Sequence, residues 1–225
     1  MDWQAFQLSI SLALCSVAIL IPFGILLGHY LARSYSLWNQ LLKAVFALPL
    51  VLPPTVMGYY LLVSMGRDSW LSQIYVFLFH EPLAFSFQGI LLGSLIFNLP
   101  FAFIPIQRAL EDIPEELKDA ARTCGLSHWQ SLFKIELPLA WKGILSAVIM
   151  TFAHTLGEFG VILMVGGNIP GQTRTLSIAI YDKVQGLEMG SAGLMSIFLV
   201  LVAFGTLLLT QLLATTKDQK PKAYL

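Results

Sequence analysis

Charged residues are scarce in this chain. Lys, Arg, Asp and Glu together make up 12% of its 225 residues, against about 25% in a typical soluble domain. Hydrophobic residues make up 56%, so we expect lipid to be the main solvent of the protein. The formal net charge is zero, which argues against nucleic acid as a partner.

Cysteines and catalytic motifs are equally sparse. The two cysteines, Cys15 and Cys124, stand in an apolar run and in a polar segment, so we expect neither a disulfide nor a zinc site. The sequence contains no Gly-x4-Gly-Lys-Ser/Thr phosphate-binding loop and no supported Ser/His/Asp or paired-carboxylate arrangement. It therefore predicts a protein that is not an enzyme, that needs no metal or other cofactor, and that relies on another chain for any ATP hydrolysis.

Five apolar runs are long enough for the roughly 20 residues that a bilayer core requires. They cover about residues 8–31, 44–65, 88–106, 143–165 and 191–214. The segment before residue 12 lacks the basic region that opens a cleavable signal peptide, so we expect the first run to be a retained span. The sequence thus predicts an all-α fold: a single transmembrane domain over residues 1–225 with five transmembrane helices.

The second run cannot form a regular helix. Pro49, Pro53 and Pro54 each lack an amide donor and collide with the preceding turn. We expect a broken or unwound helix, buried in protein or lining an aqueous cavity, because freed carbonyl groups are costly in lipid. Between the second and third runs, Trp70–Phe79 is apolar but too short to span, which predicts an interfacial helix with aromatic anchors.

The basic residues predict the orientation in the membrane. With five spans, ten of the Lys and Arg residues fall on one side: Arg33, Lys43, Arg108, Lys118, Arg122, Lys134, Lys142, Lys217, Lys220 and Lys222. The other side receives Arg67, Arg174 and Lys183. Because cytoplasmic loops are enriched in Lys and Arg, we expect the polar insert and the C-terminus in the cytoplasm and the N-terminus outside.

The insert, about residues 108–142, is the one long polar interval of the chain. Its first part, 113–123, is predicted to be a helix that Gly125 ends, because glycine takes a positive φ just past a helix end. Ser127 opens a second amphipathic piece, which we expect Pro138 to close. Physical chemistry alone leaves two interpretations open, a solvated loop and a docking element.

The spacing of the insert favours docking. Asp119-Ala120-Ala121, three residues, Gly125, nine residues and Ile135-x-Leu137-Pro138 resembles the Glu-Ala-Ala loop of ABC importer permeases, with Asp in place of the first Glu. In that family the loop forms a coupling helix that sits in a cleft of the cytoplasmic ATPase. The resemblance implies that these seven residues couple to an ATPase. A small-residue face at Ala120 and Ala121 would allow the close approach.

Two further stretches extend the resemblance. Leu48–Tyr60 and Leu156–Gly160, together with Gly167–Thr175, resemble the molybdate permeases among the type I ABC importers; sulfate/thiosulfate and tungstate permeases are close relatives. The resemblance implies a homodimer in the inner membrane with the path at the subunit interface. It also implies two ATPase subunits and a periplasmic oxyanion-binding protein. The expected cargo is molybdate, with tungstate and sulfate as alternatives.

An oxyanion path should offer neutral donors and helix N-termini. Thr55, Thr151, Thr155 and Ser177 are candidates, although small hydroxyl residues also serve simple interhelical packing. Arg174 could attract an anion at the mouth or contact an external partner.

His154 and Glu158 share one face of the fourth run. Ionisable residues at membrane depth are functional candidates, but Glu158 could equally bond a neighbouring helix or a loop amide near the outer interface. If these two residues do drive transport, the protein would be an ion-coupled secondary transporter. No internal repeat is visible, which counts against that class.

Overall fold

The computed structural model describes residues 2–32 and 36–215, and within these ranges the secondary structure is helical with no strand. Four helical runs are long and apolar enough to cross a membrane. They contain α1 (Trp3–Leu31), α5 (Phe87–Glu111), α8 (Leu137–Gly157) and α11 (Met189–Thr215). A bent helix pair makes a fifth candidate span. The predicted all-α, multi-span fold is confirmed, whereas Arg33 and the three lysines after residue 215 lie outside the described residues.

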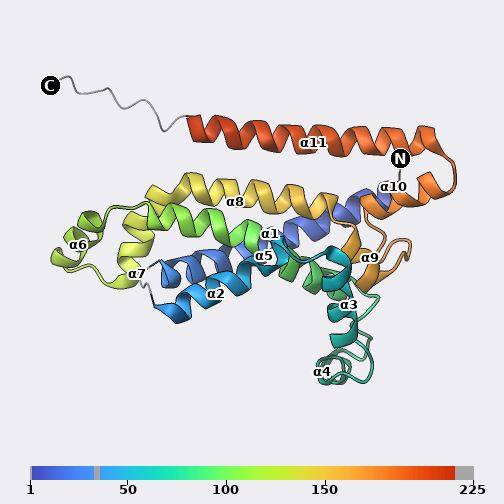
Figure 1. Ribbon diagram of the computed structural model, residues 1–225, viewed down its shortest axis with the longest axis horizontal. Coiled ribbons are helices and arrows are strands. Elements are labelled where there is room, and N and C mark those ends of the chain that lie inside the picture. The colour runs from blue at the N-terminus through green and yellow to red at the C-terminus, as the bar shows by residue number, and fades with distance from the viewer. Residues whose placement is uncertain (1, 33–35, 216–225) are drawn as a thin grey trace.

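Helices α1, α5 and α8 form the core of the bundle, lying side by side in Figure 1. Their shared apolar core includes Leu20, Ile106 and Ala147, all of which are buried. Gly143 lets α8 approach α5 closely, because a Cβ at this position would collide with the Ala109 side chain. The small residue at this crossing therefore determines how closely the two helices pack.

The proline-rich second run is broken, as expected. It consists of α2 (Leu37–Ala47), the short 3₁₀ turn η1 (Leu48–Leu50) and α3 (Pro54–Ser64), and α3 bends away from the first part by 106°. Beyond α3, the short helix α4 (Trp70–Phe79) projects from the bundle (Figure 1). Its Phe77 side chain is 81% exposed, and its position at a membrane interface stays a prediction.

The region expected to hold the fourth span contains two helices. Helix α8 begins six residues earlier than residue 143 and ends at Gly157, and α9 (Gly160–Gly166) follows after a break. Helix α9 packs against α3, with Val161 and Val165 in their common apolar cluster. After a loop, α10 (Leu176–Gln185) leads into α11.

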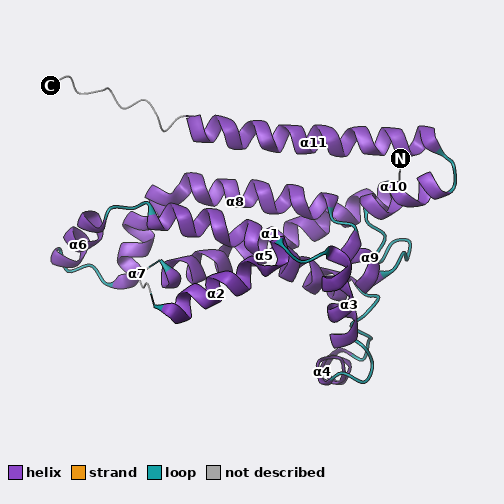
Figure 2. Ribbon diagram, viewed as in Figure 1, coloured by secondary structure: helices purple, strands orange, loops and turns teal. Residues whose placement is uncertain are grey.

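The connecting segments gather at the two ends of the bundle (Figure 2). One end carries the polar insert, and the last turns of α11 lie toward the same end (Figure 1). The start of α1, α9 and α10 lie at the opposite end. Helix α11 is mostly exposed and runs beside the bundle, so its apolar surface is available to lipid or to another protein. The polar insert and the last turns of α11 therefore lie toward one end of the bundle. Which end is cytoplasmic stays a prediction.

Candidate functional site

The polar insert folds into two short helices at one end of the bundle, α6 (Glu115–Thr123) and α7 (His128–Ser131) (Figure 1). Pro114 occupies the N-cap of α6, and two glutamates fill its first turn, where the helix dipole favours negative charge. Arg122 lies in the last turn, where positive charge is favoured. The helix predicted at 113–123 is confirmed and begins two residues later.

Two ion pairs link residues three apart on α6. Lys118 Nζ lies 2.8 Å from Glu115 Oε1, and Arg122 Nη1 lies 2.8 Å from Asp119 Oδ1. The Lys118 side chain is buried, whereas that of Asp119, the first residue of the coupling pattern, is 66% exposed. The exposed pair of Asp119 and Arg122 contributes little to stability.

The two alanines of the pattern have different surroundings. Ala121 is 3% exposed and packs inward, whereas Ala120 faces outward. Adjacent residues of a helix point in different directions, so the expected small-residue face formed by both alanines is wrong. Ala120 alone offers a small side chain at the surface, beside the Asp119 carboxylate.

Gly125 reverses the chain after α6 with a φ of +78°, as predicted. Its N–H donates to the Arg122 carbonyl oxygen at 2.9 Å, and the Leu126 N–H donates to the Ala121 carbonyl oxygen at 3.1 Å. These bonds satisfy carbonyl groups left open at the helix end. A Cβ at Gly125 would meet open space, so the backbone conformation, and not crowding, is what requires glycine.

Large apolar side chains are exposed on the same polar end of the molecule. Leu117 is 44% exposed, Trp129 is 59% exposed and Phe133 is 63% exposed. Exposed apolar groups rimmed by charges are typical of a surface that receives another protein. The insert therefore combines a rigid short helix, a small exposed residue and apolar flanks.

The base of the insert is anchored in the bundle by a buried carboxylate. Glu136 is 2% exposed; its Oε2 accepts a bond from His29 Nδ1 of α1 at 2.8 Å, and its Oε1 accepts one from Ser131 Oγ at 3.0 Å. Glu136 ends a five-residue π-helical turn, η2 (Leu132–Glu136). Such turns interrupt regular helices and are frequent at functional sites.

The three other residues of the coupling pattern lie where η2 meets α8, Ile135 in η2 and Leu137 and Pro138 in the first turn of α8. Ile135 and Leu137 are partly buried, and Pro138 is exposed. We expected Pro138 to close the second piece of the insert. This expectation is wrong, because the helix continues through Pro138. A proline in the first turn of a helix costs little since its missing N–H has no intrahelical partner there. The insert is thus directly continuous with the membrane helix α8.

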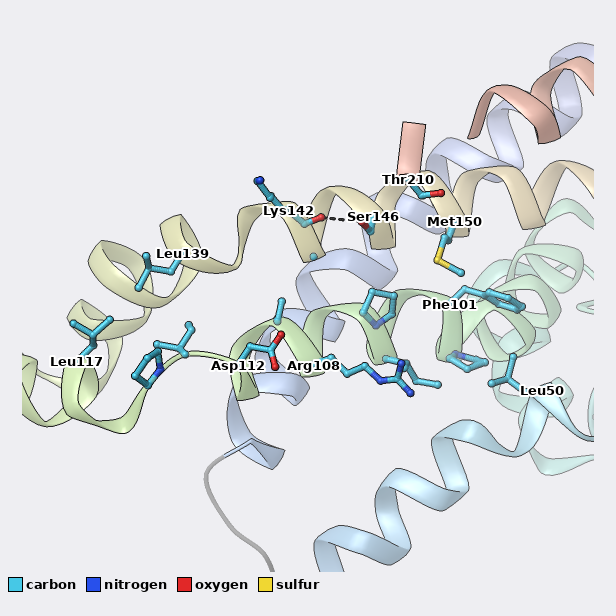
Figure 3. Close-up of a pocket in the computed structure, with 17 residues that line it drawn as sticks. Leu50, Phe101, Arg108, Asp112, Leu117, Leu139, Lys142, Ser146, Met150 and Thr210 are labelled. Carbon is cyan, nitrogen blue, oxygen red and sulfur yellow. Dashed lines mark hydrogen bonds between the residues drawn. The ribbon is translucent and has the colours of Figure 1, made fainter. Parts of the chain in front are cut away.

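An open cavity of about 1080 Å³ lies next to the insert, between α5, α8 and Thr210 of α11 (Figure 3). Most of its lining is apolar, including Phe101 and Met150. Three charged residues, Arg108, Asp112 and Lys142, line the end nearer α6 (Figure 3). The cavity is wide enough to accept side chains of another helix, and its charged end is the one close to the insert.

The four pathway candidates have different surroundings. Thr55 is exposed in the first turn of α3, whereas Thr151 and Thr155 are buried in α8. Thr155 Oγ1 donates to the Thr151 carbonyl oxygen at 2.8 Å, and Ser177 Oγ donates to the Glu158 carbonyl oxygen at 2.6 Å. Three of the four therefore bond main-chain oxygen or lie in the protomer interior, and their role in a path stays a prediction.

A buried polar cluster surrounds Glu158 at the other end of α8. We call Ser16, Ser94, Asn98, His154 and Glu158 the Glu158 cluster. Glu158 is 4% exposed, and its Oε2 accepts bonds from Ser94 Oγ at 3.0 Å and Asn98 Nδ2 at 2.9 Å. Asn98 Oδ1 in turn accepts from His154 Nδ1 at 2.9 Å. Sequence reasoning did not single out Ser94 and Asn98, although two polar residues four apart in an apolar helix share a face.

Arg174 is engaged within the chain. Its Nε donates to Asn168 Oδ1 at 2.6 Å, and its guanidinium lies 3.5 Å from an Asp182 oxygen and 4.0 Å from an Asp2 oxygen. These contacts link the loop before α10 to α10 itself and, more loosely, to the N-cap of α1. Two carboxylates offset the charge of Arg174, which leaves it poorly suited to attract an anion.

The comparison with known families decides what this arrangement belongs to. Residues 21–219 match the family described as binding-protein-dependent transport system inner membrane component. The chain belongs to this family. Together with its apolar helices, membership makes the chain a multi-pass inner-membrane protein.

Individual relatives of this transport component match over nearly their whole length. This chain is 41% identical to the molybdenum transport system permease protein ModB of Azotobacter vinelandii, over 90% of each chain. It is 40% identical to the protein of the same name from Escherichia coli K12, over 97% of this chain and 96% of the other. These relatives are named as permeases, which points to a translocation component and not to an enzyme.

The fold of the transport component also matches a solved structure. A bacterial ABC transporter involved in import of the polysaccharide alginate superposes with a TM-score of 0.74. That match covers 96% of this chain and 79% of the other at 17% identity, so it supports the fold alone.

Proposed function

We propose that the chain is the permease subunit of an ATP-driven importer that carries molybdate across the inner membrane. The observation that carries the proposal is the geometry of the insert. An exposed Asp119 and Ala120 on α6, followed by the turn at Gly125, form a compact docking helix at one end of the bundle. The insert continues directly into α8, so a displacement of α6 would be passed directly to a membrane-spanning helix. The names and high coverage of the molybdenum permease relatives support molybdate as the cargo.

In this proposal α6 is the coupling helix of a cytoplasmic ATPase subunit. Leu117, Trp129 and Phe133 supply apolar contacts around it, and the alternating charges of α6 supply the polar rim expected of a protein interface. The seven residues of the coupling pattern, which fall between Asp119 and Pro138, then have two different roles. Asp119, Ala120 and Gly125 face or shape the partner surface, whereas Ala121, Ile135, Leu137 and Pro138 hold the insert on the bundle.

We further propose that two copies of the chain form the transport path between them. A single copy leaves much of α11 and the open cavity beside α5 and α8 uncovered. A second copy would cover apolar surface of this kind, and a path between two copies needs no wide channel within one. The end that carries α6 faces the cytoplasm, and the opposite end, with α9 and α10, receives a periplasmic oxyanion-binding protein.

The experiment that tests the proposal is reconstitution of the permease with its ATPase and its binding protein in proteoliposomes. We expect accumulation of molybdate that requires ATP inside and the loaded binding protein outside. Competition with tungstate and with sulfate distinguishes the three oxyanions. Preferential uptake of sulfate would overturn the choice of cargo but not the class of transporter.

A matched pair of variants tests the docking helix. Gly125→Trp and Gly171→Trp both place a large side chain at a positive φ, +78° and +73° respectively, at opposite ends of the bundle. We expect Gly125→Trp to abolish co-purification of the ATPase and Gly171→Trp to preserve it. Retention of the ATPase by Gly125→Trp, with uptake intact, would refute the assignment of α6.

The second candidate is an ion-coupled secondary transporter, because the buried Glu158 and the partly buried His154 both bond Asn98. That mechanism predicts uptake without ATP that collapses when the proton gradient is removed. In the same proteoliposomes, uptake that persists without ATP would favour it, and uptake insensitive to proton-conducting agents would exclude it.

A further inference from the structure

Helix α8 is flanked by two buried carboxylates. Glu136 immediately precedes it and Glu158 immediately follows it, at 2% and 4% exposure. A helix of 21 residues is about 30 Å long at 1.5 Å per residue, so the two groups stand at opposite ends of the bundle. Glu136 occupies the unspecified position between Ile135 and Leu137 of the coupling pattern and bonds His29 of α1. Glu158 belongs to no docking surface, and its role follows from what it contacts.

Glu158 joins three elements at one point. Its side chain accepts bonds from Ser94 and Asn98, both on α5. Its main-chain carbonyl oxygen accepts a bond from Ser177 in the first turn of α10. Its second carboxyl oxygen, Oε1, is buried with no hydrogen-bond partner. Residue 158 is therefore the place at which the end of α8 is attached to both neighbouring helices.

Further hydrogen bonds connect the partners of Glu158 to α1 and to the preceding turn of α8. Ser16 of α1 donates to Ser94 at 3.3 Å, and His154, one turn earlier on α8, bonds Asn98. In an apolar bundle a polar group that loses its partner is costly. The members of the Glu158 cluster therefore tend to keep their bonds and to move together.

The break at Glu158 also sets the position of α9. Gly160 begins α9 two residues later, and a Cβ there would approach Pro54 of α3 to 2.9 Å. Farther along, Val161 packs with Leu61 of α3. Helix α3 is the part of the broken second span that bends by 106°. A change in direction at residue 158 must therefore displace α9 and the α3 segment packed on it.

We propose that Glu158 is a positioning residue that transmits the movement of α8 to the α9–α3 unit at the far end of the bundle. This inference rests on the proposed function, because α8 moves only if an ATPase acts on the insert. In this mechanism the ATPase displaces α6, α8 moves as a rigid rod, and the Glu158 cluster carries that movement into α9 and α3. The carboxyl group acts through its contacts and need not touch the anion.

The test uses the complete transporter in proteoliposomes and measures two rates, molybdate accumulation and ATP hydrolysis. We expect Glu158→Ala to lower the number of molybdate ions carried per ATP at least about fivefold, the lower range of coupling between distant sites. ATP hydrolysis itself should continue, because the docking helix is unchanged. Glu158→Gln keeps an oxygen that accepts from Ser94 and Asn98, so it should restore most of the wild-type ratio.

Glu81→Ala is the matched control. Glu81 is exposed in the connection between α4 and α5, so its loss should leave the ratio unchanged. If Glu158→Ala fails to assemble with the ATPase, Ser94→Ala takes its place, since it removes one bond to the carboxylate and little volume. An unchanged ratio in an assembled Glu158→Ala transporter overturns the inference. If that variant does not assemble, an unchanged ratio in Ser94→Ala overturns it.

A failure of the proposed function has a different signature. In that case the wild-type transporter itself accumulates no molybdate on addition of ATP. A wild-type transporter that couples normally, together with a Glu158→Ala variant that couples equally well, rejects the role of Glu158 alone. Loss of the ratio in both Glu158→Ala and Glu158→Gln would show that the negative charge, and not the hydrogen-bonded position, is what matters, and would also overturn the inference.

Discussion

His29 and Glu136 are 107 positions apart in the chain, and their side chains meet in the buried base of the insert with 2.8 Å between Nδ1 and Oε2. The bond joins the last turn of α1 to the π-helical turn that precedes α8. It attaches the base of the insert to the bundle. In the proposed mechanism, this attachment would direct a movement of α6 into α8.

The first prediction concerns the hydrogen bond between His29 and Glu136. His29→Ala removes one hydrogen bond to the buried Glu136, and the loss of a bond to a buried charged group costs about 1–3 kcal/mol. We expect a corresponding loss in the free energy of unfolding of the detergent-solubilised protein. A triple variant, His29→Leu with Ser131→Ala and Glu136→Leu, should recover part of the loss because it removes the carboxylate together with the two side chains that bond it. A His29→Ala protein as stable as the wild type would show that the bond does not hold the base.

The second prediction separates docking from folding at Asp119. Its side chain is largely exposed and its pair with Arg122 is a surface pair, so Asp119→Lys should change the stability of the permease by no more than about 1 kcal/mol. Reversal of the charge at the proposed interface should nevertheless weaken co-purification of the ATPase. Asp119→Glu, which restores the usual residue of the pattern, should retain it. Equal ATPase recovery with Lys and Glu would remove Asp119 from the interface.

The third prediction concerns the crossing of α5 and α8. A Cβ at Gly143 would collide with Ala109 and lie 2.9 Å from the Pro105 carbonyl oxygen. We expect Gly143→Ala to destabilise the permease by about 1–3 kcal/mol, the usual cost of overpacking a core. Gly205→Ala is the control, because a Cβ there meets open space on α11. Thermal unfolding of the two variants side by side distinguishes crowding from a general effect of alanine.

The fourth prediction concerns Arg174, whose guanidinium lies near Asp2 and Asp182. Since these carboxylates offset its charge, Arg174→Gln should change the molybdate concentration at half-maximal uptake by less than about twofold, and stability by less than about 1 kcal/mol. Uptake should be measured at low and high salt, because long-range attraction of an anion would be screened by salt. A salt-dependent loss of uptake in Arg174→Gln alone would show that the charge does attract the anion.

Local features of the chain could be predicted from the sequence because their causes are local. Helix α6 follows from its flanking charges and from Gly125, whose positive φ ends it. The break in the second span follows from Pro53 and Pro54, which remove hydrogen-bond donors wherever they stand. The expectation for Pro138 was wrong because the same residue is harmless in a first helical turn, and the start of that helix could not be located from the pattern alone.

Other features depend on which segments meet. The break after Gly157 contains no proline, so nothing in its sequence required it, and its bonds come from α5 and α10. The opposite surroundings of Ala120 and Ala121 depend on which side of α6 faces the bundle. For the same reason, the resemblance to a known loop predicted which residues couple to an ATPase but not which of them face outward.

The sequence by itself determined that the protein lies in a membrane, that its helices are broken at the second span, and that a charged helix stands between two apolar stretches. Composition and short-range hydrogen bonding are sufficient causes for each of these. Only the tertiary structure decided that α8 runs between two buried glutamates, Glu136, which bonds α1, and Glu158, which bonds α5. A buried carboxylate is tolerated only where distant segments supply its donors, and which segments do so is a property of the packed bundle.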